Sequence, residues 1–202
     1  MRILFVSNSD ISQPLADWLT CQAHETVCAW AEKLSVNVVK NLHPDLLVSY
    51  NYRHIIREEV LNLLERKTMN LHISLLPWNR GAHPNLWSFL DGTAKGVTIH
   101  LIEKGVDTGD ILLQHEVFFD EEVETLESSY KKLHQEIQKL FITHWDDLKH
   151  ERLPARKQIG RGTKHYAREC EELIALFGET LWQMPIRLVK QKYQELCKSK
   201  KI

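Results

Sequence analysis

The chain has 202 residues, of which 43% are hydrophobic and 26% charged, and its formal net charge is -1. This length suits one α/β domain with a small appendage, and the near-zero charge provides no global basic field for nucleic acid. The sequence has no apolar run of about 18 residues, the length a membrane span needs, and polar residues follow Val6 too early for a secretory signal peptide. We therefore expect a cytoplasmic protein that binds neither nucleic acid nor membranes.

Cysteine and histidine spacing gives no sign of a metal site. The cysteines, Cys21, Cys28, Cys170 and Cys197, show no Cys-x-x-Cys pattern, and the 11 histidines are scattered. In a sequence, a metal site is usually recognised by closely spaced ligand residues. The sequence predicts reduced thiols in a cytoplasmic protein and no bound metal.

Strands alternate with helices over the first half of the chain. Short apolar runs between turn residues predict strands at residues 3–7, 25–30, 45–49 and 69–73. Helices are predicted at residues 15–19, 57–66 and 84–90. Two more strands, at residues 96–102 and 110–118, lie close enough to form a hairpin, which indicates a mixed sheet. The pattern predicts an α/β fold: a Rossmann-like, mostly parallel sheet with flanking helices and a ligand crevice at the carboxyl ends of its strands.

The second half begins with the clearest helix and then changes character. Apolar residues recur every three or four positions over residues 123–149, which predicts an amphipathic helix docked on the sheet. A basic, glycine-containing loop follows at 157–165, and helices are predicted at 168–177 and 186–197. We place a soft boundary near Glu151, dividing a catalytic domain (1–150) from a C-terminal extension (151–202) for substrate or dimer contacts.

Three polar residues mark a candidate acid/base site. Residues 69–73 alternate between apolar and polar, so Asn70 and His72 face the same side of a predicted strand. A carboxylate delivered by the next unit of the fold would complete the site. Asp107 and Asp110 both lie in the polar turn before the last strand, and either could supply it, although Asp107 also suits an ordinary tight turn.

The motifs resemble a known family. Asn-x-His-x-Ser-Leu-Leu-Pro at 70–77, an Arg-Gly loop at 80–81 and Asp-Thr-Gly-Asp at 107–110 are similar to the formyltransferases that use N10-formyltetrahydrofolate. The resemblance runs from about residue 1 to 117. It implies the formyltransferase fold, N10-formyltetrahydrofolate as formyl donor, and Asn70, His72 and Asp107 as catalytic residues. It also implies a set of folate-binding residues: Arg53, His54, Ile55, Ser74, Leu75, Leu76, Pro77 and Val106.

Formyl transfer to an amine gives each catalytic residue a task. The carbonyl must be polarised, the oxyanion of the tetrahedral intermediate held, and the surplus proton of the amine removed. Asn70 can donate a neutral N–H bond to the oxygen. His72, if protonated, can donate a charged one, and Asp107 can hold that imidazolium and accept a proton, directly or through a water.

The acceptor amine is the least determined part of this interpretation. The extension is too short for the added barrel of the tRNA-acting branch, and the glycine-rich phosphate loop of the glycinamide ribonucleotide branch has no counterpart at residues 7–12. We expect a nucleotide-linked amino sugar, such as dTDP-4-amino-4,6-dideoxyglucose, used for surface polysaccharide by a homodimeric enzyme. Glycinamide ribonucleotide, or a folate-binding module without turnover, remains the alternative. The expected acceptor-binding residues are Asn8, Asp10, Arg80, His83 and Asn85.

Overall fold

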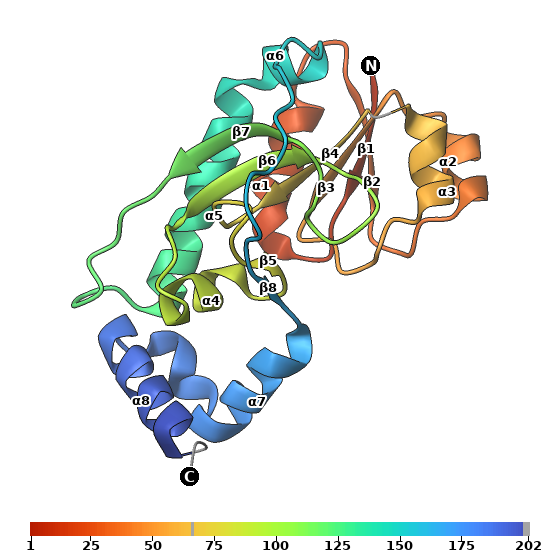
Figure 1. The fold of residues 1–202 in the computed structure, drawn as a ribbon. Helices are drawn as coiled ribbons and strands as arrows, with labels where there is room; N and C mark the ends of the chain where they lie inside the picture. Colours follow the sequence, from red (N-terminus) through yellow and green to blue (C-terminus); the bar gives the residue numbers. More distant parts are fainter. Residues whose placement is uncertain (66, 200–202) are drawn as a thin grey trace.

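The computed structural model describes residues 1–65 and 67–199 and is built around a mixed sheet (Figure 1). Within these residues, six strands lie in the order β2-β1-β3-β4-β6-β7. They are β1 (Arg2–Val6), β2 (Thr26–Trp30), β3 (Leu46–Tyr50), β4 (Thr68–His72), β6 (Gly96–Leu101) and β7 (Ile111–Glu116). The first four pair in parallel, whereas β6 runs antiparallel to both β4 and β7. The predicted Rossmann-like, mixed sheet is confirmed.

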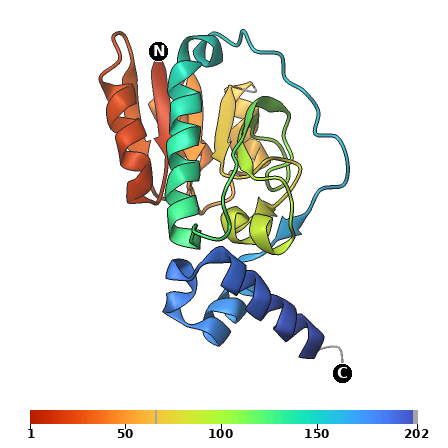
Figure 2. The same ribbon diagram turned by 90° about the vertical axis from the view of Figure 1, so that its left-hand side faces the viewer.

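Helices cover both faces of the sheet. On one face lie α1 (Gln13–Thr20), α5 (Leu126–Thr143) and α6 (Trp145–Lys149), and on the other lie α2 (Val36–Leu42), α3 (Glu58–Leu61) and the short 3-10 turn η2 (Asn62–Leu64) (Figures 1 and 2). The alternation along β1 assigns its side chains to these layers, because Ile3 and Phe5 pack under α5 whereas Leu4 and Val6 pack under α2 and α3. Burial of both faces explains why β1 is apolar from Ile3 to Val6 and β3 is apolar from Leu46 to Val48.

Two predicted helices are shorter than expected. The segment predicted over 123–149 begins only at Leu126, because Thr125 and Ser128 form a capping box there, and it is interrupted at His144, whose backbone leaves the helical region. Its apolar face does dock on the sheet, as predicted. The segment predicted over 57–66 forms α3 and η2 and then ends at Glu65, whose φ is +43°; Arg66 lies outside the described residues. Helix α2, capped by Ser35, was not predicted.

The chain after Glu151 crosses the molecule and folds against α4 (Pro84–Leu90). It first forms a bridge from Arg156 to Ile111 at the start of β7, and then β8 (Lys164–His165) pairs in parallel with β5 (Arg80–Gly81). It ends in α7 (Ala167–Phe177), the 3-10 turn η3 (Glu179–Gln183) and α8 (Ile186–Ser199), which form a layer below the sheet in Figure 1. This layer buries apolar residues of α4: Leu86, Trp87 and Phe89.

The helices of the described residues do not meet the length and apolarity that a bilayer span requires. The longest of them, α5, has charged and amide side chains along the face away from the sheet.

A buried hydrogen-bond network joins β3 to α5. The Tyr50 hydroxyl lies 2.5 Å from His134 Nδ1, and Gln138 donates to the Tyr50 oxygen at 3.3 Å. His134 is 1% exposed, and burial lowers the pKa of its imidazole from 6.5 to about 4. The folded protein therefore holds this ring neutral, with Nδ1 accepting the tyrosine hydrogen.

This burial makes stability depend on pH. Between pH 6.5 and about 4 the unfolded chain protonates His134 and the folded chain does not, so the free energy of unfolding falls as the pH is lowered through this interval. The contribution lost by pH 4 is about 3 kcal/mol. His134→Gln keeps a hydrogen-bond acceptor but cannot titrate. Urea unfolding at pH 7, 5 and 4 should show a steeper acid loss in the wild type than in this variant; equal losses would contradict the assignment.

Candidate active site

A cleft opens at the carboxyl ends of β3 and β4, where the fold predicts a ligand site. Its volume is about 730 Å³, which is within the range of small-molecule pockets. The loops after β3, β4 and β6 form its walls, and residues of β8 and the start of α7 close one side. Asn70, His72, His100 and Asp107 form its polar floor.

The three predicted catalytic residues converge in this cleft. The Asp107 carboxylate lies with Oδ1 3.3 Å from Asn70 Nδ2 and Oδ2 3.6 Å from His72 Nδ1. Oδ2 also accepts the Gly81 N–H at 2.8 Å. Asp107 itself adopts a left-handed φ of +53° in a turn rich in glycine. The rival carboxylate, Asp110, is directed elsewhere and pairs with Lys157 at 2.8 Å.

His100 is a fourth member of the site that sequence analysis did not identify. Its Nε2 lies 3.2 Å from Asn70 Nδ2 and 3.5 Å from Asp107 Oδ1. The antiparallel register of β4 and β6 pairs His100 directly with Asn70. The alternation of residues 96–101 places Thr98 and His100 on one face, and this would have been the available signal had the pairing of these two strands been known.

The hydrogen bonds fix where the protons lie. His72 Nε2 lies 3.1 Å from the Asn79 carbonyl oxygen, which can only accept, so the imidazole hydrogen is on Nε2 and Nδ1 faces Asp107. His100 Nδ1 similarly donates to the Leu101 carbonyl at 2.7 Å, leaving Nε2 to accept from Asn70. Both amide hydrogens of Asn70 thus have acceptors, in His100 and Asp107. Donation to a reacting oxygen requires one of these bonds to be exchanged.

Burial and charge have opposite effects on the two titrating partners. Burial lowers the pKa of His72, although the nearby Asp107 carboxylate acts against it. Burial alone would raise the pKa of Asp107, but His72 and His100, which attract the carboxylate when they are protonated, and the Gly81 N–H bond hold that pKa below its usual range. The unliganded site therefore contains a carboxylate anion beside a neutral imidazole with an open Nδ1.

The residues expected to bind folate separate into two groups. Arg53, His54, Ile55 and Val106 line the cleft. The second group, Ser74–Pro77, is not among the residues that line it and instead shapes the turn behind it: the Ser74 hydroxyl donates to the Trp78 carbonyl at 2.7 Å, and the Leu76 N–H donates to Thr98 at 3.1 Å. The Leu76–Pro77 peptide bond is cis.

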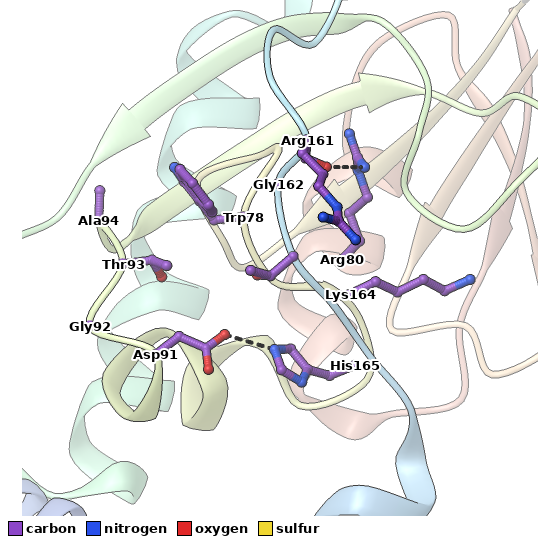
Figure 3. Close-up of a pocket in the computed structure, with 11 residues that line it drawn as sticks. Trp78, Arg80, Asp91, Gly92, Thr93, Ala94, Arg161, Gly162, Lys164 and His165 are labelled. Carbon is purple, nitrogen blue, oxygen red and sulfur yellow. Dashed lines mark hydrogen bonds and ion pairs between the residues drawn. The ribbon is translucent and has the colours of Figure 1, made fainter.

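Among the residues expected to bind the acceptor, His83 lines the cleft and the other four lie apart from it. The Arg80 guanidinium bonds Gln158 and the Arg161 carbonyl beside an adjoining cavity (Figure 3). The buried Asn85 amide is satisfied by Leu126 and Ser129.

Asn8 supports a loop of the cleft without lining it, and Asp10 is exposed. The Asn8 side chain donates to the Ala31 carbonyl at 2.8 Å and accepts the Arg53 N–H at 3.0 Å, so it holds the loop that carries Arg53. Lys164 and Tyr166, which also line the cleft, come from the C-terminal extension.

Comparison with known proteins identifies the family. The sequence pattern of the family described as formyl transferase matches residues 22–144. The chain is 35% identical to the formyltransferase PseJ from Anoxybacillus kamchatkensis, solved in complex with UDP-4,6-dideoxy-4-formamido-L-AltNAc and tetrahydrofolate. The two structures superpose with a TM-score of 0.85, covering 94% of this chain and 97% of that one.

Curated relatives share a shorter segment. Methionyl-tRNA formyltransferase from Clostridioides difficile is 38% identical over 93 residues, which are 46% of this chain and 30% of that protein. The bifunctional polymyxin resistance protein ArnA from Wigglesworthia glossinidia brevipalpis is 38% identical over 99 residues, which are 48% of this chain and 15% of that protein. This chain thus matches less than a third of the length of either relative. The predicted resemblance is confirmed: the chain belongs to the formyl transferase family, in which it is most like the sugar N-formyltransferases.

Proposed function

We propose that this protein transfers a formyl group from N10-formyltetrahydrofolate to the amine of a nucleotide-linked amino-dideoxy sugar. The observation that carries the proposal is the convergence of Asn70, His72 and Asp107 on the floor of one cleft of about 730 Å³. The similarity to PseJ over nearly the whole of both chains, C-terminal extension included, favours a sugar acceptor. The sequence match to methionyl-tRNA formyltransferase covers 46% of this chain and 30% of that protein.

The residues lining the cleft fit a folate donor on one side and a charged acceptor on the other. Ile55, Ile56, Ile102 and Val106 provide apolar wall for a flat ring system. Lys164, where β8 borders the cleft, provides a cation for a diphosphate. Arg53, His54 and Ile55 are kept as donor-binding residues, and His83 as an acceptor-binding residue. The similar PseJ was solved with tetrahydrofolate and a UDP-linked formamido sugar, which is the same pairing of ligands.

In the proposed reaction each of these side chains has a step. The amine attacks the formyl carbon, a C–N bond forms and the carbonyl electrons move to oxygen; collapse then breaks the bond to N10 of tetrahydrofolate. One proton leaves the amine and one reaches N10. His72 Nδ1, open and beside the Asp107 anion, accepts the first proton, and Asp107 stabilises the resulting imidazolium. The Asn70 amide supplies a donor to the oxyanion by releasing one of its present bonds.

Three wider features belong to the same proposal. The reaction would serve surface polysaccharide synthesis in the cytoplasm, and the enzyme would be a homodimer. Light scattering of the purified chain measures the last of these directly.

Replacing Asp107 by Asn tests the assignment of the carboxylate. Asn tolerates the left-handed backbone at this position and can still accept the Gly81 N–H, so the fold should be kept. It cannot stabilise a charged His72, so kcat should fall by about 100-fold or more. Asp110→Asn is the matched control, because Asp110 faces Lys157. It should lose less than about tenfold. The reverse ranking of these two variants would show that the other carboxylate is catalytic.

The acceptor is tested by parallel assays with N10-formyltetrahydrofolate. UDP- and dTDP-linked 4-amino-4,6-dideoxy sugars, glycinamide ribonucleotide and methionylated initiator tRNA are each supplied, with Asp107→Asn as the blank. Release of tetrahydrofolate, and the mass of a formyl group on the acceptor, should appear with an amino sugar. Turnover only with the ribonucleotide or the tRNA would reject the proposal. Folate binding without turnover on any acceptor would indicate a binding module.

A further inference from the structure

The segment from Arg156 to His165, called the strap below, runs from Ile111, the first residue of β7, to β5 and contacts the loop that carries Asp107. We propose that Gln158 of this strap is a positioning residue that holds Asp107, and with it the Gly81 N–H, in the geometry needed for formyl transfer. The inference rests on the proposed function, since it concerns the same site.

The Gln158 amide is saturated by groups of the two catalytic loops. Its Nε2 donates to the backbone carbonyls of Asp107 and Gly109, each at 2.8 Å. Its Oε1 accepts from Arg80 Nε at 3.0 Å and Nη2 at 2.6 Å. The carbonyls can only accept and the guanidinium can only donate, so the orientation of the amide is unambiguous.

Asp107 needs such support because of the turn in which it lies. Its φ is +53°, and glycines at 105 and 109 flank it. Gly109 approaches the Leu101 carbonyl so closely that a Cβ would lie 1.8 Å from the oxygen. By bonding the carbonyls of Asp107 and Gly109, Gln158 fixes the conformation of this turn and thereby the direction of the Asp107 side chain.

The hydrogen bonds between Gln158 and Arg80 support the same carboxylate. Gly81, the next residue, donates its N–H to Asp107 Oδ2 at 2.8 Å. By holding the Arg80 side chain, Gln158 therefore fixes both the carboxylate and one of its donors. The Arg80 side chain also bonds the Arg161 carbonyl, so the strap contacts it twice (Figure 3).

A second residue of the strap extends this support to His72. The Thr163 hydroxyl accepts the Asn79 N–H at 2.8 Å, and its carbonyl accepts the Arg80 N–H at 3.0 Å. Asn79 is fully buried, and its carbonyl oxygen is the acceptor that orients His72. The strap itself is held at its end by His165, which pairs with Asp91 at 2.8 Å (Figure 3). The His165 ring also stacks on Trp87.

The test uses the full chain and three variants. Gln158→Met removes both the donors to the Asp107 and Gly109 carbonyls and the acceptor for Arg80. Gln158→Glu keeps an acceptor for Arg80 but removes the donors to Asp107 and Gly109. Gln191→Met, on α8, is the matched control, since this exposed glutamine bonds Glu195 far from the cleft. For each, kcat and the KM values for N10-formyltetrahydrofolate and a UDP-linked 4-amino-4,6-dideoxy sugar are measured, together with Tm and the amide hydrogen exchange of Gly81 by NMR.

Both Gln158 variants should lose roughly 100-fold in kcat, the usual effect of a displacement of about 1 Å in a catalytic group. The KM values should change little, and Gly81 exchange should accelerate by about tenfold or more. Gln191→Met should match the wild type. If Gln158→Met fails to fold, Gln158→Glu decides, because it retains the Arg80 contact.

Normal kcat and Gly81 exchange in Gln158→Glu would overturn the inference, since the amide donors to Asp107 would then be dispensable. A lowered Tm and raised KM values, with kcat unchanged, would also overturn the inference. A merely structural role predicts that result. A wild type without turnover on any acceptor would instead reject the proposed function. The inference about Gln158 would then be decided by Gly81 exchange, which requires no substrate.

Discussion

The largely buried charge of Asp107 is the constraint on which the site depends. Its side chain is only 13% exposed, and a buried carboxylate is stable only where hydrogen-bond donors replace water. Asn70 comes from β4 and the Gly81 N–H from the loop after it, with the imidazoles of His72 and His100 close by on β4 and β6. The antiparallel insertion of β6 beside β4 is what brings these groups to one point. The mixed topology is thus tied directly to the chemistry.

The same arrangement sets the order of proton transfer. Because these partners hold the pKa of Asp107 low, the carboxylate stays ionised and acts through its charge. The pKa of His72 is lowered, and its Nε2 hydrogen is donated to the Asn79 carbonyl. Its Nδ1 therefore carries a lone pair and faces the Asp107 carboxylate. The protonated imidazole that we first expected as an oxyanion donor is therefore disfavoured before the substrates bind. In the proposed reaction it forms when the amine gives up its proton, and Asp107 is already in place to stabilise it.

Local periodicity predicted what depends on local sequence, and little beyond it. The alternation of Met69–Ile73 correctly placed Asn70 and His72 on one face, and the apolar runs located the strands, because burial on both faces requires them. Asp107 was assigned through family resemblance, since spacing alone allowed Asp110. His100 was missed because its contact with the site depends on the pairing of β6 with β4. Gln158 was missed because it reaches Asp107 from a segment 51 residues further along the chain. Arg80 and Asn85 were expected to bind substrate, and this role stays a prediction: their side chains bond the protein itself, while Arg80 also lines the adjoining cavity.

The boundary near Glu151 marks a change in sequence character, and the contacts across it are those of a single folded unit. Without the chain beyond it, the Asp107 and Gly109 carbonyls and the Arg80 guanidinium would lose their partner in Gln158. Each orphaned polar group costs about 1–3 kcal/mol when it cannot reach water. Leu86, Trp87 and Phe89 of α4 would also lose the apolar layer formed by α7 and α8. The segment that sequence patterns describe as an appendage therefore contributes both to the core and to the hydrogen bonds that hold the turn of Asp107.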